Sequence, residues 1–137
     1  MTLANVLATN TASYQVVLSN AYGMSTSAVV SLTVVDPFIV TQPASRTNNA
    51  GTTATFSVTV YGTAPLSYRW RKGSTPLANT GNVSGATTNL LTLTNVTTND
   101  AASYSVIITN PVGSVTSSNA RLTVPWFSLV AISQPGS

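Results

Sequence analysis

The amino-acid sequence predicts an all-β protein whose central unit is a Greek-key β-sandwich, and three observations support this prediction. Residues 2–34 align with residues 92–124 at a constant offset of 90 positions, and 15 of the 33 aligned residues are identical. Short segments that alternate apolar and polar side chains recur about every ten residues, as strands do. Clusters of Gly, Pro and Asn separate these segments and mark turns. Roughly seven short strands in a unit of about 90 residues are typical of a Greek-key sandwich.

The internal repeat sets the expected organisation of the chain, because self-similarity at a fixed period indicates repeated structural units. One complete unit is expected at residues 36–125. Residues 1–35 correspond to the last three strands of a preceding copy. The segment 39–43 is echoed by 131–135, so residues 126–137 are expected to be a linker and the first strand of a following copy. The chain is therefore predicted to contain one complete unit between two partial units.

The strands of the complete unit can be assigned in order along the chain. The first long strand, 53–60, alternates apolar and polar residues and is rich in β-branched side chains. In the next strand, 66–71, Leu66, Tyr68 and Trp70 are expected on one face and the residues between them on the other. The remaining expected strands are 90–94, 103–109 and 114–124, and the intervening turns lie at 61–65, 72–76 and 110–113.

Composition excludes several classes of function. Charged residues make up only 5% of the chain, far below the ~25% of an average soluble domain. The net charge of +3 comes from five basic and two acidic residues with no block of like charge, which argues against binding nucleic acid. Cysteine and histidine are absent, so disulfides and thiolate metal sites are excluded. No run approaches the ~20 apolar residues of a membrane span.

The residues that could support catalysis are few. Acid–base catalysis needs two positioned titratable groups, and the two carboxylates of this chain are Asp36, at a unit boundary, and Asp100, in a turn. We expect both to be structural and to lie farther apart than the ~5–10 Å of a glycosidase pair. Serines are plentiful, but histidine is absent and Lys72 is expected in an exposed turn. The sequence therefore predicts a protein that is not an enzyme and holds neither cofactor nor metal.

Several motifs of the 36–125 unit resemble those of intermediate-set (I-set) immunoglobulin-like domains, of the kind found in tandem in large secreted bacterial proteins. The most specific is the combination of Trp70 with Asp100-x-Ala-x-Tyr104. The resemblance implies an immunoglobulin-like sandwich with Tyr104 in a tyrosine corner, where the hydroxyl bonds a backbone group slightly upstream. Tyr14 is the counterpart of Tyr104 in the earlier copy, and Asp100 is expected to cap the same turn. Further matching segments are Gly51, 56–58, 62–65, Leu93, 110–113 and 122–124.

The sequence departs from the family pattern at the two positions that usually carry cysteine. Val58 and Val106 stand there, with Val16 in the earlier copy. The inter-sheet disulfide of the family, which would contribute ~2–4 kcal/mol, is therefore missing. Two valines packed under Trp70 would offset part of that loss, because burying each one is worth ~1.5 kcal/mol or more.

Two groups of side chains are candidates for a binding face. Arg69 and Arg71 are expected to project outward, with Ile107 on the neighbouring strand beside them. Such a face could hold a partner, or it could consist of two solvated arginines that keep the sheet soluble. The candidate exposed aromatics are Tyr61, Trp126 and Phe127. They could stack on sugar rings, or Trp126 and Phe127 could pack at the junction between successive domains, as Phe38 would at the earlier boundary.

Two functional hypotheses remain open. The first is a non-catalytic structural or adhesive array of a secreted or surface bacterial protein, whose partners are other immunoglobulin-like repeats or copies of itself. Its partial units lack partner strands, and residues 129–132 are a candidate donor strand, so assembly into an extracellular filament by strand exchange belongs to this hypothesis. The second is a carbohydrate-binding accessory module, with polysaccharide as the ligand, of a larger extracellular enzyme. Both place the chain outside the cell or on its surface, although it contains no secretion signal of its own.

Overall fold

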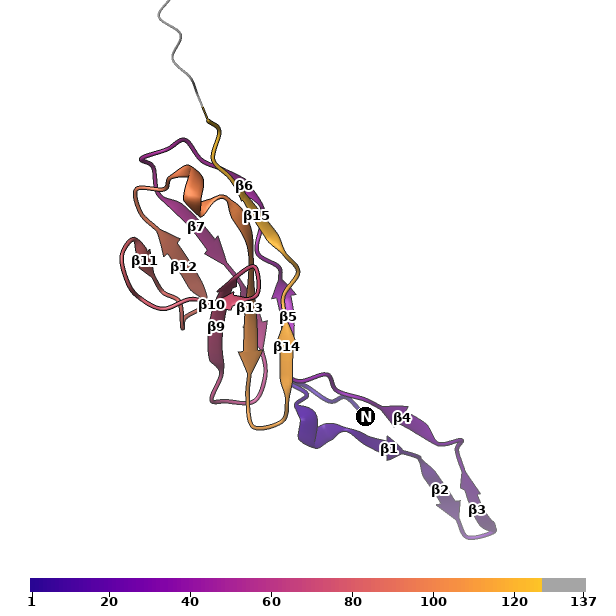
Figure 1. The fold of residues 1–137 in the computed structure, drawn as a ribbon. Coiled ribbons are helices and arrows are strands. Elements are labelled where there is room, and N and C mark those ends of the chain that lie inside the picture. The colour runs from indigo at the N-terminus through magenta and orange to yellow at the C-terminus, as the bar shows by residue number, and fades with distance from the viewer. Residues whose placement is uncertain (127–137) are drawn as a thin grey trace, which may run out of the picture.

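The computed structural model describes residues 1–126 and is built from short strands and two 3-10 turns. Residues 36–126 form a two-layered β-sandwich, and residues 1–35 form an extended N-terminal arm that leaves one end of the sandwich (Figure 1). The predicted all-β class and the immunoglobulin-like sandwich are confirmed.

One layer of the sandwich is built around the longest strand, β13 (Ala102–Thr109). It pairs with β9 (Ser67–Lys72) on one side. On the other side it pairs first with β15 (Ala120–Thr123) and then with β14 (Ser114–Thr116). All these pairs are antiparallel, whereas β15 pairs in parallel with β6 (Arg46–Thr47). A short strand, β10 (Thr75–Pro76), adds to the free edge of β9.

The second layer carries the strands that face β9 and β13 across the core. Its centre is β12 (Leu90–Leu93), which pairs antiparallel with β7 (Ala54–Ser57) and with β11 (Val83–Ser84). The chain continues from β7 into β8 (Thr59–Tyr61), which pairs with β5 (Phe38–Thr41). The expected strand 53–60 is thus broken at Val58, whose amide donates instead to the carbonyl of Asn89.

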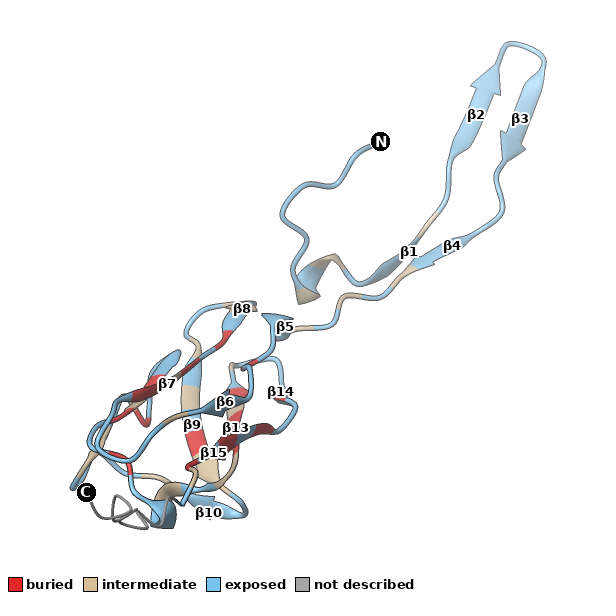
Figure 2. Ribbon diagram, turned by 90° about the horizontal axis from the view of Figure 1, so that it is seen from above, coloured by how far each residue is buried: buried red, intermediate tan, exposed pale blue. Residues whose placement is uncertain are grey.

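The core lies between the two layers and is aromatic at its centre. Trp70 is fully buried, and its indole Nε1 donates to the carbonyl oxygen of Thr88 at 2.8 Å. The ring of Phe56 stacks on that of Tyr104 with centroids 5.1 Å apart and lies 6.4 Å from that of Trp70. Figure 2 shows that buried positions are confined to the sandwich. The buried cluster consists of Ile39, Ala54, Phe56, Val58, Trp70, Leu91, Leu93, Val96, Tyr104, Val106, Ile108, Ala120, Leu122 and Val124.

The N-terminal arm folds as two short antiparallel ladders in line. β1 (Ala12–Tyr14) pairs with β4 (Val30–Leu32), and β2 (Val17–Asn20) pairs with β3 (Gly23–Thr26). At the offset of 90 these strands correspond to β13, β14 and β15. The 3-10 turn η1 (Ala8–Asn10) likewise corresponds to η2 (Thr98–Asp100).

One expected strand of the arm does not form. Residues 1–7 contain no strand, although their counterparts include most of β12. The reason is tertiary: β12 is held by hydrogen bonds to β7, and the arm has no strand that corresponds to β7 among the described residues. The expected final strand, 114–124, is also divided, because Ser117 leaves the ladder and both its amide and its hydroxyl bond the backbone of Val106.

Candidate functional site

The tyrosine corner is present in both copies of the repeat with nearly the same geometry. The Tyr104 hydroxyl donates to the carbonyl oxygen of Asp100 at 2.7 Å, and the Tyr14 hydroxyl donates to that of Asn10 at 2.8 Å. The carboxylate of Asp100 accepts the amide of Thr97 at 2.8 Å, which closes the turn before the corner. In the arm the side chain of Asn10 does the same with the amide of Leu7. The arm therefore keeps the local structure of its counterpart.

The hairpin that follows is also held by the same side chains in both copies. The Oδ1 atom of Asn110 accepts the amides of Val112 and Gly113, and the Oδ1 atom of Asn20 accepts those of Tyr22 and Gly23. From the sequence we expected a turn at 110–113, but we did not predict that the side chains of Asn20 and Asn110 hold these turns. The available signal was that Asn and Gly are identical at the two ends of this turn in both copies, whereas the two residues between them differ.

Burial is where the two copies differ. Val106 is fully buried, whereas its counterpart Val16 is 65% exposed, and Ala120 is fully buried, whereas Val30 is 67% exposed. Burial, followed by the charge of Asp100, raises the pKa of Tyr104 to about 12. Apolar side chains of the arm line an open groove of about 480 Å³.

A second site lies where the arm meets the sandwich, and it centres on Asp36. The Oδ2 atom of Asp36 accepts the Thr63 hydroxyl at 2.6 Å, and Oδ1 accepts the Thr63 amide at 2.9 Å and Asn110 Nδ2 at 2.6 Å. From the arm, the amide of Ala8 lies 3.4 Å from Oδ2. The hydrogen bond from the Thr63 hydroxyl, with the weaker ones, holds the pKa of Asp36 below its ordinary value. One carboxylate thus joins two loops of the sandwich to the arm.

Close backbone packing surrounds Asp36. A Cβ atom at Gly62 would lie 2.6 Å from Asp36 Oδ1 and 3.1 Å from the Cα of Pro37, so only glycine fits there without a shift. Pro37 itself is fully buried. The loops at the junction are therefore closely packed against each other, although they are distant in sequence.

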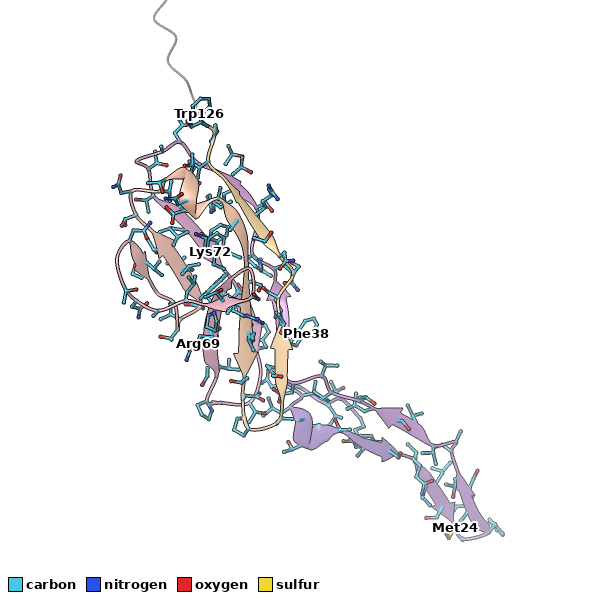
Figure 3. The ribbon with its side chains drawn as sticks, viewed as in Figure 1. Met24, Phe38, Arg69, Lys72 and Trp126 are labelled. Carbon is cyan, nitrogen blue, oxygen red and sulfur yellow. The ribbon has the colours of Figure 1, made fainter. Side chains whose placement is uncertain are left out.

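The aromatic candidates lie at opposite ends of the sandwich. Phe38 and Tyr61 face each other across the β5–β8 ladder, are 54% and 71% exposed, and line a groove of about 210 Å³ with Val6 and Leu7 of the arm. Trp126 is 78% exposed and lies at the far end from the arm (Figure 3). Tyr61 and Trp126 therefore do not share a surface. Phe127 lies outside the described residues.

The two arginine candidates differ from each other. Arg69 is exposed and lies opposite Ile107 in the β9–β13 ladder, so these two share one face. Arg71 lies two residues along the same strand and is half-buried: its guanidinium donates to the carbonyl of Ser74 at 2.8 Å, and its Nε atom is buried with no partner among the described residues. Lys72 is not in an exposed turn. It ends β9, is half-buried and donates to the carbonyl of Asn99.

The part of the chain that the structure describes was also searched for groups of metal ligands and for membrane-spanning helices. Residues 1–126 contain no group of three or more His, Cys, Asp or Glu side chains that could hold a metal ion. Over the same residues, no helix is long and apolar enough to cross a bilayer.

Comparison with known proteins agrees with this geometry. Residues 37–124 match the immunoglobulin I-set domain, and the chain belongs to that family. A search of curated proteins returned no match.

Solved structures give the same fold. The I-band fragment I67-I69 from titin is 30% identical, with a TM-score of 0.60 over 66% of this chain and 33% of that one. The chain thus spans about a third of that fragment. A complex of titin M10 with an obscurin-like 1 immunoglobulin domain is 28% identical over 66% of this chain and 94% of that one, with a TM-score of 0.60. Drosophila OTK extracellular domains 3-5 cover 89% of this chain and 42% of theirs, at 23% identity and a TM-score of 0.62, and show the fold alone.

Proposed function

We propose that this chain is a structural repeat of a tandem immunoglobulin-like array on a secreted or surface bacterial protein, and that it carries no catalytic activity. Its role is to hold successive units at a defined spacing and orientation. The partner of each unit is another repeat of the same kind.

The observation that carries this proposal is the hydrogen bonding of Asp36. A linker that only connects two units needs no side chain that binds both. Here one carboxylate accepts hydrogen bonds from Thr63 and Asn110 of the sandwich and lies 3.4 Å from the amide of Ala8 in the arm. Such a contact fixes the direction in which the arm leaves the sandwich. Orientation at the junction is the property that an array needs.

The similar structures give further support. One is a chimeric titin Z1Z2-Z1Z2 tandem, 26% identical with a TM-score of 0.60 over 83% of this chain and 64% of that one. Another pairs a titin immunoglobulin domain with one from an obscurin-like protein. Both are cases in which immunoglobulin domains stand next to other immunoglobulin domains.

Assembly of copies into a filament by strand exchange is a further part of the proposal. The unpaired edges of β1 and β4 support it, because their counterparts β13 and β15 are hydrogen-bonded to β9 and β6. Light scattering after size-exclusion chromatography tests it directly. A mass that grows with concentration is expected from strand exchange, and a monomer at every concentration would contradict it.

The carbohydrate-binding alternative is less well supported by the placement of the aromatic side chains. Tyr61 lies beside Phe38 and the arm, whereas Trp126 lies at the far end of the sandwich, so the two cannot stack on one sugar chain as a row. The proposed function therefore rests on the junction and not on a ligand site.

The proposal is tested by measuring the distance between the arm and the sandwich. Because the chain has no cysteine, spin labels can be attached to Met24→Cys, on the exposed hairpin, and Ser74→Cys, in an exposed turn. We expect a single narrow distance distribution that broadens in Asp36→Ala. Asn20→Ala, which removes the matching turn contacts in the arm, is the control and should leave the distribution narrow. A broad distribution in the unsubstituted chain would contradict the proposal.

A further inference from the structure

The N-terminal arm has an uncovered apolar face formed by Val6, Tyr14, Val16, Val30 and Leu32. These side chains line the groove of about 480 Å³. Their counterparts at the offset of 90 are Val96, Tyr104, Val106, Ala120 and Leu122, and each of these is at most 1% exposed. The groove therefore has the lining of a sandwich interior.

The complete unit shows what covers such a face. In it, the ring of Phe56 from the facing layer stacks on Tyr104 at 5.1 Å, and Trp70 lies beside Val106 as its cross-strand neighbour in the β9–β13 ladder. Both rings come from the first half of the unit, residues 36–91. The arm contains neither Phe nor Trp among its residues 1–35, so it cannot supply these rings itself.

The sandwich of the same chain cannot cover the arm either. The arm extends away from it (Figure 1), and most of the arm is coloured as exposed in Figure 2. Two arms packed face to face would bring together two surfaces that both lack the large rings. An interior packed to ordinary density needs those volumes to be filled.

We infer that the arm face is a docking surface for a polypeptide segment of the same repeat type as residues 36–91, which supplies a Phe–Trp pair and a strand equivalent to β7. The inference rests on the proposed function and deepens it by naming the partner of residues 1–35. Docking pairs the free edge of β1 as β9 pairs β13. It also lets Thr2 and Leu3 join a sheet, as their counterparts Thr92 and Leu93 do beside β7.

The repeat offset dictates the test. Residue 92 corresponds to residue 2, so a second copy of residues 36–91 joined directly to Thr2 of the full chain supplies the partner in the natural register. Val16→Cys then reports on the arm face by its rate of thiol labelling, and Val106→Cys reports on the equivalent position in the complete unit. Val30→Cys and Ala120→Cys form a second pair, in case either substitution at the first pair disturbs folding.

Without the added segment, and at a concentration where light scattering shows a monomer, we expect Val16→Cys to label rapidly and Val106→Cys slowly. With the segment, labelling of Val16→Cys should slow to within about tenfold of Val106→Cys, because both then require local unfolding to react. The matched control carries Phe56→Ser and Trp70→Ser in the added copy only, and it should leave Val16→Cys reactive.

Three results would overturn the inference. One is equal labelling of Val16→Cys with and without the added segment. Another is protection by the control segment that lacks the two rings. The third is protection of Val16→Cys in the monomeric, unextended chain, which would mean that the arm face is covered from within the same chain. None of these results changes the Met24–Ser74 distance distribution, which tests the proposed function. A failure of this inference can therefore be distinguished from a failure of the proposed function.

Discussion

The side-chain amide of Asn110 donates to the carboxylate of Asp36 at 2.6 Å, across 74 positions of sequence. The same Asn110 side chain also accepts two amides of its own hairpin turn. It therefore fixes the turn and the repeat junction together. Its counterpart Asn20 makes the turn contacts alone.

This difference predicts unequal effects of the same substitution. Asn110→Ala removes both sets of contacts, whereas Asn20→Ala removes only those of an exposed turn. We expect Asn110→Ala to lower the urea midpoint of the sandwich clearly and Asn20→Ala to leave it unchanged. Fluorescence of the buried Trp70, in a Trp126→Phe background, reports the transition. Equal midpoints for the two variants would show that the Asp36 contact adds no stability.

The pH dependence of the junction follows from the hydrogen bonds that Asp36 accepts. They favour the ionised carboxylate and hold the pKa of Asp36 below 3.8. The stabilisation is fully present above 3.8, the ordinary value, and is lost as the pH falls through the lowered value. A carboxyl NMR titration should place the midpoint of Asp36 below 3.8 and move it upward in Thr63→Val. A native midpoint at or above 3.8 would contradict the role of Thr63.

The hydrogen bond of the tyrosine corner can be removed in each copy of the repeat, and the two effects on stability can be compared. Tyr104→Phe leaves the carbonyl of Asp100 without its donor in a buried setting, and should cost about 1 kcal/mol of unfolding free energy. Tyr14→Phe removes the equivalent bond in the arm, which is not covered by a second layer, so it should leave the unfolding of the sandwich unchanged. Urea unfolding followed through Trp70 measures both. A loss of similar size in the two variants would mean that the arm and the sandwich unfold as one unit.

Gly81 and Gly85 both have left-handed backbone conformations, but only Gly85 has a neighbouring atom that a Cβ atom would clash with. Comparing their alanine variants therefore distinguishes the cost of backbone strain from the cost of a steric clash. At Gly81, with φ of +59°, a Cβ atom would meet nothing within 4 Å. Gly81→Ala should therefore cost only the left-handed strain of about 1–2 kcal/mol. At Gly85, with φ of +74°, the Cβ atom would lie 1.9 Å from the carbonyl oxygen of Leu90. Gly85→Ala should cost more, because β12 must shift, and equal thermal midpoints for the two variants would refute this.

Several features could be read from the sequence because they depend on neighbouring residues. The repeat predicted an all-β sandwich. The pairs Tyr104–Asp100 and Tyr14–Asn10 span only four positions, and the hydrogen bond forms in both copies although only one has a second layer. Local sequence is sufficient for such contacts.

Other features depend on groups far apart in the chain. Asp36 was recognised only as a boundary residue, because its partners Thr63 and Asn110 lie 27 and 74 positions away. The strand expected near the start of the arm does not form, because it needs a partner strand that the arm lacks. Alternation placed Arg69 and Arg71 on one face but did not predict the half-burial of Arg71, whose guanidinium donates to the carbonyl of Ser74 in the following turn.

The most direct test of the account is nitrogen-15 NMR relaxation of the unsubstituted chain. If Asp36 fixes the junction, the amides of Ala8–Asn10 and of β1 reorient together with those of β13 and β15, and one anisotropic tumbling tensor fits both sets. Two independent correlation times, with the shorter one in the arm, would contradict the central claim that these repeats are held in a fixed orientation.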